Sequence, residues 1–369
     1  MKNFILEPGG KIVFGGGCVR EYLASFARKY GPNILLVSGS RSGQKNGAYD
    51  EVFRSLRDAG KNIVELPGVQ PGPEYEMAQR GAQLAREQHV DLILGVGGGS
   101  VADCCKAISM AAVCRGDLWA DFWARQGVVD FQPLPVGLIP TTLGTGELNG
   151  AIVLTCRSCG ARRARNYPQC SPQFILFDPA YTETLPQTQI VSDGFRIFSR
   201  ALELYLAPPA EACVTDGLLE SLMWNVIREL QAGRAEGWSN PARGNLMWAG
   251  ALVGDDLLQA GKRCGYPCRQ TALQLAENTG RSFTDCLAVL QAAAYRSACG
   301  RQAGKMARLA DRVWGIAPDS RPKEARALAG ADAMEAFLRT LGLPTAPQEL
   351  GIREPEAFEP LAEQAARAG

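Results

Sequence analysis

The chain has 369 residues, with 39 lysines and arginines against 38 aspartates and glutamates, and a formal net charge of +1. This length suits two domains or one large one, and a near-neutral chain with 46% hydrophobic residues is neither disordered nor built to coat a nucleic acid. The first residues lack the apolar run of a signal peptide, and no apolar stretch is long enough for a transmembrane helix, so we expect a soluble protein without membrane contact.

The first half of the chain alternates short apolar runs with amphipathic stretches. Strands are predicted at residues 11–14, 33–37, 62–66, 91–96, 136–139, 151–155 and 174–177. Helices are predicted between several of them, at residues 19–29, 48–59, 74–87 and 101–111. Apolar strands that alternate with helices are typical of a mostly parallel sheet covered on both faces.

The second half of the chain shows helical periodicity and no convincing strand. Helices are predicted at residues 191–206, 213–231, 241–260, 269–280, 283–299, 301–314 and 323–340, with a last one after Pro355. The pattern changes near Pro186. We therefore expect an α/β domain over residues 1–186 and an all-helical domain over 187–369, with the ligand bound in a cleft between them.

Three glycine- or hydroxyl-rich loops each follow a predicted strand. They are Ser38-Gly39-Ser40-Arg41, Gly97-Gly98-Gly99-Ser100, and the loop that contains Thr141, Thr142 and Thr145. The carboxyl ends of strands in an open α/β sheet meet at one edge, where such folds bind ligands. Glycines let a backbone approach a phosphate closely, and a helix start offers it N–H groups. The loops therefore favour nucleotide or phosphate binding, with plain tight turns as the alternative.

The counts of histidine and cysteine restrict the chemistry. Twelve thiols without a secretory signal are typical of reduced cysteines, so we expect a cytoplasmic protein. The one histidine, His89, follows a polar helical stretch and is typical of a surface residue at a helix end. A site that needs several histidines is therefore excluded.

Five segments, in chain order, carry a family resemblance: GVQPGPEYE, VDLILGVGGGSVADCCKA, IPTTLGTGELN, LFDPAYTETLP and FLRTLGLPTAPQELGI. Together they resemble the iron-containing (group III) alcohol dehydrogenases, and most of all the branch of NADPH-dependent butanol dehydrogenases and aldehyde reductases. The resemblance runs from about residue 11 to residue 352. It implies a Rossmann-like dinucleotide-binding domain followed by a helical metal-binding domain, usually assembled as a homodimer or larger homo-oligomer.

The resemblance also implies a cofactor site. Gly97, Gly98, Gly99 and Ser100 match the loop that cradles the pyrophosphate, Asp103 belongs to the same pattern, and Thr141, Thr142 and Thr145 match a loop along the cofactor. Arg162 replaces a lysine near the cofactor. NAD-preferring members have an aspartate where this chain has Gly39, flanked by Ser38, Ser40 and Arg41. Hydroxyls and a guanidinium suit a 2′-phosphate, so we expect NADP(H) rather than NAD(H).

The family binds its metal with one aspartate and three histidines, and this chain departs from that set at every ligand. Arg196 stands at the aspartate position and Arg200 at the first histidine, while Arg269 and Phe283 align with the other two. The two close cysteine pairs, Cys156 with Cys159 and Cys264 with Cys268, do not make up four ligands with suitable spacing. We therefore predict that the protein binds no metal.

Arg196 and Arg200 share one helix face because they are four residues apart. If Arg269 also points there, three guanidiniums gather where a cation is bound in relatives, and an anion is needed to balance their charge. In one interpretation they bind an anionic substrate and stabilise a developing alkoxide. In the other the metal site has decayed, and the arginines pair with acids such as Glu203, Asp255 or Asp256.

The sequence thus predicts a metal-independent NAD(P)H-dependent oxidoreductase that reduces a small carbonyl or other polarised double bond of an anionic substrate. Arg196, Arg200 and Arg269 would act in catalysis, and water or Tyr266 would relay the proton. The alternative is a catalytically inactive protein of the same fold that binds a dinucleotide or another anion.

Overall fold

The structure of the protein is a computed structural model that describes residues 10–39, 46–144, 148–208 and 213–352. Among these, the residues up to 186 together with 250–255 form one compact unit, the α/β unit. Residues 187–249 and 256–352 form the other, the helical unit. The predicted order, an α/β half followed by an all-helical half, is confirmed for the described part of the chain.

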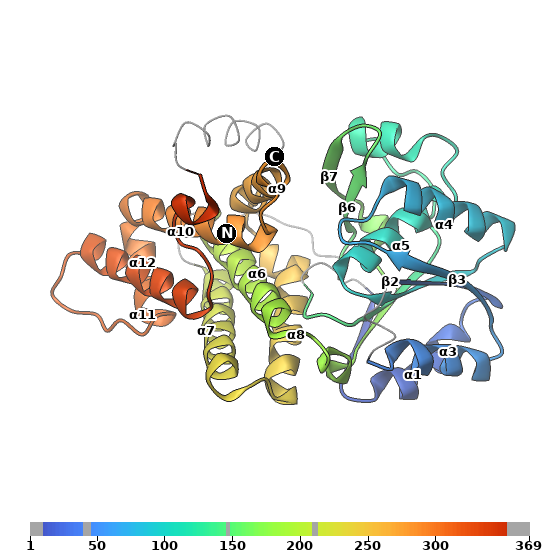
Figure 1. Ribbon diagram of the computed structural model, residues 1–369, viewed down its shortest axis with the longest axis horizontal. Helices are drawn as coiled ribbons and strands as arrows, with labels where there is room; N and C mark the ends of the chain where they lie inside the picture. Colours follow the sequence, from blue (N-terminus) through green and yellow to red (C-terminus); the bar gives the residue numbers. More distant parts are fainter. Residues whose placement is uncertain (1–9, 40–45, 145–147, 209–212, 353–369) are drawn as a thin grey trace. The chain divides into compact units, whose positions relative to one another are not determined.

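A parallel sheet of six described strands forms the centre of the α/β unit (Figure 1). The strands are β1 (Lys11–Phe14), β2 (Asn33–Gly39), β3 (Asn62–Val69), β4 (Leu92–Gly97), β5 (Val136–Pro140) and β8 (Phe174–Phe177), in the order β1-β8-β5-β4-β2-β3. Each predicted strand of the sheet is present, within three residues at either end. The buried runs of β2, β4 and β5 explain this agreement, since both of their faces are covered.

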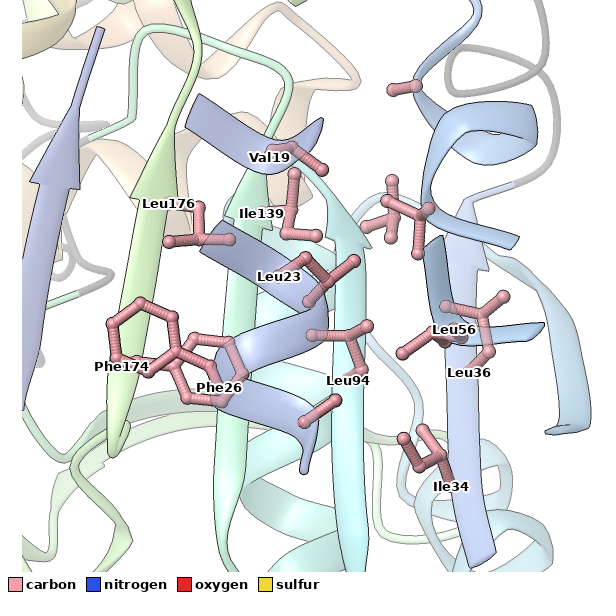
Figure 2. Packing of buried hydrophobic residues seen from close by; sticks show 14 of the residues in the cluster. Val19, Leu23, Phe26, Ile34, Leu36, Leu56, Leu94, Ile139, Phe174 and Leu176 are labelled. Atoms are coloured by element: carbon pink, nitrogen blue, oxygen red, sulfur yellow. The ribbon is translucent and has the colours of Figure 1, made fainter. Parts of the chain in front are cut away.

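Helices α1 (Cys18–Ala27) and α3 (Ala48–Asp58) pack on one face of the sheet. Figure 2 shows α1 in front of the strands, with its Leu23 and Phe26 among the side chains of Leu94, Ile139 and Phe174. The rings of Phe26 and Phe174 stack with their centroids 5.0 Å apart. These contacts follow from the alternation of side chains along each strand.

Helices α4 (Tyr75–Glu87) and α5 (Gly99–Ala111) belong to the opposite face. Two glycines allow α5 to pack closely against β4 and α4. A Cβ at Gly95 of β4 would lie 2.7 Å from the Cys105 sulfur, and one at Gly81 of α4 would lie 2.4 Å from Ile108. Because such contacts are too short for real side chains, glycine at these positions sets how close α5 lies to β4 and to α4.

A two-stranded antiparallel hairpin, β6 (Ala151–Cys156) and β7 (Ala161–Asn166), packs against α5. The sequence predicted β6 but not β7, because the segment ARRARN carries no apolar pattern and is largely exposed. A π-helical segment at Trp119–Ala124 was also not predicted, since its turn differs from the helical period.

The helical unit is built from α6 (Gln187–Leu206), α7 (Val214–Glu236), most of α8 (Asn240–Gly254), α9 (Pro267–Thr279), α10 (Phe283–Arg301), α11 (Ala303–Arg312) and α12 (Lys323–Thr340). Helix α8 ends six residues earlier than predicted, at Gly254, a residue type that commonly ends helices. The helix predicted after Pro355 lies outside the described residues. None of the described helices is both long and apolar enough to cross a membrane.

Candidate functional site

The predicted cofactor loops of the α/β unit meet at the carboxyl edge of the sheet. The register pairs Ser38 of β2 with Val96 of β4, and Gly97 of β4 with Pro140 of β5. The three strands therefore end side by side, and the described residues that follow β4 and β5 lie at this edge. Gly39 is the last residue of β2 and is half-buried. Ser40, Arg41 and Thr145, predicted for the same edge, lie outside the described residues.

The glycine loop and the threonine loop are in direct contact. The Thr141 N–H donates a hydrogen bond of 3.0 Å to the Gly97 carbonyl. A Cβ added to Gly98 would lie 3.0 Å from the Thr142 hydroxyl oxygen, so only glycine fits easily there. Helix α5 begins at Gly99 directly after these contacts, and its N-cap residue, Gly98, makes no side-chain cap. The first turn of α5 thus presents backbone N–H groups at the loop, as a bound phosphate requires.

One buried polar atom at this edge has no hydrogen-bond partner in the part of the chain that the structure describes. The Thr141 side-chain oxygen is buried, and it has no hydrogen-bond partner among the described residues. A buried hydroxyl without a partner is costly, and a bound ligand is one way to satisfy it. The glycine loop, the threonine loop and this hydroxyl therefore fit a dinucleotide cofactor.

A second turn connects the glycine loop with Arg162. The Gly72 N–H donates a 3.2 Å hydrogen bond to the Ser100 hydroxyl oxygen. The Arg162 guanidinium carbon lies 3.5 Å from the place of a Gly72 Cβ. The exposed guanidinium of Arg162 therefore lies beside Gly72, which is hydrogen-bonded to Ser100 of the glycine loop. The sequence predicted Arg162 for this site but did not predict β7. Further along α5, Asp103 is half-buried, and Lys106 is buried with its ammonium 3.2 Å from the Ala151 carbonyl.

Two of the three predicted catalytic arginines lie near one carboxylate in the helical unit. The charges of Arg269 and Arg200 both act on Glu203, which lies on α6 and is buried. The Cys268 N–H donates a 2.8 Å hydrogen bond to a Glu203 carboxylate oxygen. Burial raises the pKa of Glu203 to about 7, although the N–H groups of Cys268 and Arg269 and the two guanidinium charges oppose the rise.

Aromatic rings hold both of these arginines. The Arg200 guanidinium lies 5.0 Å from the centre of the Tyr266 ring, and the Arg269 guanidinium lies 5.6 Å from that of Phe283. Stacking of this kind fixes a guanidinium plane without neutralising its charge. Tyr266 precedes α9 with a φ of 50°, an uncommon backbone conformation for a residue other than glycine.

Arg196 has a different partner. It forms an ion pair with Asp193, one turn earlier on α6, and its side chain is 30% exposed. Its Nε also donates a 3.3 Å hydrogen bond to the Ser192 carbonyl. Among its described contacts, Arg196 is therefore turned toward the start of α6, whereas Arg200 and Arg269 gather at Glu203.

The residues predicted to stand at the metal-ligand positions offer no donor atom to a metal. Guanidiniums at 196, 200 and 269 and a phenyl ring at 283 offer no lone pair to a cation. Within the described residues there is no group of three or more histidine, cysteine, aspartate or glutamate side chains that could hold one.

Sequence reasoning missed a cavity of about 520 Å³ in the helical unit. Glu203, Cys264, Cys268 and Gln291 are among the residues that line it. Both cysteines are half-buried there, rather than packed as small apolar residues. The cavity depends on packing between α6, the segment before α9, and α10, and no local sequence pattern reports it.

Two family models match the chain, one over its first half and one over its second half. The model for iron-containing alcohol dehydrogenases matches residues 9–179, and that for the C-terminal part of the same family matches residues 190–369. The chain therefore belongs to the iron-containing alcohol dehydrogenase family, which confirms the resemblance read from the five segments.

Two relatives cover almost the whole chain. A probable NADH-dependent butanol dehydrogenase of Bacillus subtilis is 29% identical over 99% of this chain and 94% of its own length. The NADPH-dependent aldehyde reductase YqhD of Escherichia coli is 29% identical over 95% of this chain and 90% of its own. Among solved structures, an NADH-dependent butanol dehydrogenase A from Thermotoga maritima superimposes with a TM-score of 0.90 at 25% identity, over 100% of this chain and 91% of its own.

Proposed function

We propose that the protein is a metal-independent, NADP(H)-dependent reductase of a small carbonyl compound that carries an anionic group. Family membership supports an enzyme of the alcohol and aldehyde dehydrogenase class, with a nicotinamide cofactor. The observation that carries the finer proposal is the gathering of Arg200 and Arg269, each stacked on an aromatic ring, at positions where the family has metal ligands.

The loops at the carboxyl edge of the sheet would hold the cofactor. Gly97, Gly98 and Ser100 would surround the pyrophosphate at the start of α5, and the buried Thr141 hydroxyl would gain its missing partner. The relatives are named for NADH in one case and NADPH in the other. The choice of NADP(H) therefore depends on the end of β2, where this chain has Gly39 instead of an acidic residue.

When bound, the reduced nicotinamide supplies the hydride for carbonyl reduction. Arg200 and Arg269 would donate hydrogen bonds to the substrate oxygen or to its anionic group, since guanidinium donors are always protonated. Burial raises the pKa of the Tyr266 phenol, so the phenol carries its proton near neutral pH. Tyr266 would give that proton, directly or through water, to the oxygen as it becomes an alcohol.

The first test is a fluorescence titration of chelator-treated protein with NADPH and, separately, with NADH. We expect saturable binding of NADPH with the tighter Kd, and turnover of an anionic aldehyde that a chelator does not lower and iron or zinc does not raise. Activity that appears only after metal is added would contradict metal independence. Failure to bind either nucleotide would contradict the cofactor site.

Gly39→Asp tests the cofactor preference. Gly39 is the last residue of β2, so an aspartate there places a carboxylate at the carboxyl edge of the sheet. Its carboxylate would repel the 2′-phosphate, and we expect the Kd for NADPH to rise about fivefold while that for NADH stays within twofold. Gly39→Asn is the matched control, because it has the same shape without the charge. Equal effects of both variants on NADPH would contradict the electrostatic explanation.

The second candidate function is an inactive dinucleotide-binding protein. Glu203 favours it, because a buried carboxylate beside Arg200 and Arg269 can balance their charge without a substrate. Tight NADPH binding without turnover of any carbonyl in a broad screen would support this candidate over the enzyme.

A further inference from the structure

The turn between β6 and β7 places two cysteines together. Cys156 is the last residue of β6, and Cys159 lies in the turn that leads to β7. In the strand ladder Cys156 is paired with Ala161, and the Gly160 N–H closes the turn with a 3.1 Å hydrogen bond to the Arg157 carbonyl. The hairpin thus holds the two sulfurs on one short, closed segment.

The two sulfurs also share hydrogen-bonding groups. The Cys159 N–H donates to the Cys156 sulfur over 3.2 Å. The Ser158 hydroxyl lies 3.2 Å from the Cys156 sulfur and 3.9 Å from the Cys159 sulfur. The Ser158 hydroxyl thus contacts both sulfurs, and each thiol shifts the pKa of the other.

The two cysteines differ in the direction of their pKa shifts and in their exposure to solvent. Burial raises the pKa of Cys156, but hydrogen bonds from the Cys159 thiol, the Ser158 hydroxyl and the Cys159 N–H outweigh it and lower that pKa. The same thiol hydrogen bond raises the pKa of Cys159. Cys156 is 1% exposed, whereas Cys159 is open to solvent. The pair therefore combines a covered sulfur that favours the thiolate with an exposed sulfur that an oxidant can reach.

We propose that Cys156 and Cys159 form a redox-active dithiol that hydroperoxides oxidise to a disulfide. The Cys159 thiol loses its proton to solvent, and its sulfur attacks the outer oxygen of the hydroperoxide. The O–O bond breaks, Cys159 becomes a sulfenic acid, and the inner oxygen takes up that proton and leaves as water or an alcohol. The Cys156 thiolate then attacks the Cys159 sulfur, the S–O bond breaks, and the hydroxide leaves as water with a proton from solvent. One hydroperoxide is reduced by two electrons for each disulfide formed.

A metal is the competing occupant of this turn, because two cysteines in a tight hairpin are also half of a zinc site. No third or fourth ligand of the described residues completes such a site with Cys156 and Cys159. The dithiol needs no further residue, so the structure favours redox chemistry over metal binding.

Peptide mapping of the full-length, reduced protein after one equivalent of hydrogen peroxide tests the proposal. Trypsin cuts after Arg157, which separates the cysteines into peptides 126–157 and 158–162. We expect these two peptides to stay linked after oxidation, and to separate when dithiothreitol is added. The link should be lost in Cys156→Ser and Cys159→Ser and kept in Cys114→Ser, a control at a half-buried cysteine outside the pair.

The single variants report the order of the steps. In Cys156→Ser the resolving sulfur is absent, so dimedone should trap a sulfenic acid at Cys159. Recovery of both cysteines as free thiols after peroxide would overturn the proposal. It would also be overturned by one zinc ion bound per chain that either serine variant releases.

Discussion

Replacement of Arg200 by alanine should lower kcat by more than about tenfold, or about 1.4 kcal/mol of transition-state stabilisation, while the Kd for NADPH stays within twofold. The guanidinium stacks on Tyr266 and acts on the buried Glu203, so it is held in a fixed position in the helical unit. A fixed, permanently charged donor stabilises a developing alkoxide without having to reorganise. Steady-state kinetics with the best substrate from a screen of anionic aldehydes and ketones measures the effect.

A control variant and a rescue experiment distinguish this catalytic role of Arg200 from a structural one. Arg312→Ala on α11 removes a guanidinium whose side chain is 67% exposed, and it should leave kcat unchanged. Added guanidinium should restore part of the rate of Arg200→Ala, which simple loss of packing would not allow. Unchanged turnover in both Arg196→Ala and Arg200→Ala would contradict the catalytic assignment. Arg196 is expected to have the smaller effect of the two, because it is paired with Asp193.

The sequence could predict the centre of the sheet because the central strands are buried on both faces. The runs in β4 and β5 are apolar from end to end, so these strands can be predicted without knowing where their partner strands lie. Strand β7 shows the opposite case. Its alternation of alanine and arginine is polar throughout, and only pairing with β6 makes it a strand. Arg162, predicted only by resemblance, is therefore placed by a strand that the sequence does not reveal.

The candidate site, too, could be predicted from the sequence only in part. The cofactor loops were predictable because each follows a strand, and parallel strands end at one edge. The surroundings of Arg200 were not, because they depend on Tyr266 having a positive φ and on α9 beginning at Pro267 instead of residue 269. Proline at the first position of a helix was the available signal for that start. The N–H groups of Cys268 and Arg269 reach Glu203 only because α9 begins there.

The free energy of unfolding should fall by about 3 kcal/mol between about pH 5 and pH 8 through Glu203 alone. Burial raises the pKa of this carboxyl from 4.5 to about 7 in the folded protein. Between these values the folded chain holds a proton that the unfolded chain releases, so rising pH favours unfolding. The contribution is complete below about pH 4.5 and is lost as the pH rises through 7. The charges of Arg269 and Arg200 and the N–H groups of Cys268 and Arg269 oppose the rise in the Glu203 pKa but do not cancel it.

Glu203→Gln removes this titration and keeps an oxygen for the Cys268 N–H. Urea unfolding followed by circular dichroism should therefore show a variant that gains up to about 3 kcal/mol on the wild type as the pH rises from about 5 to about 8. Glu277→Gln, an exposed change on α9, is the matched control and should follow the wild type at both pH values. If Glu203→Gln and the wild type lose stability in parallel, the carboxyl is ionised throughout. Arg200 and Arg269 would then be neutralised by Glu203 in the resting protein, which would favour the inactive binding protein over the reductase.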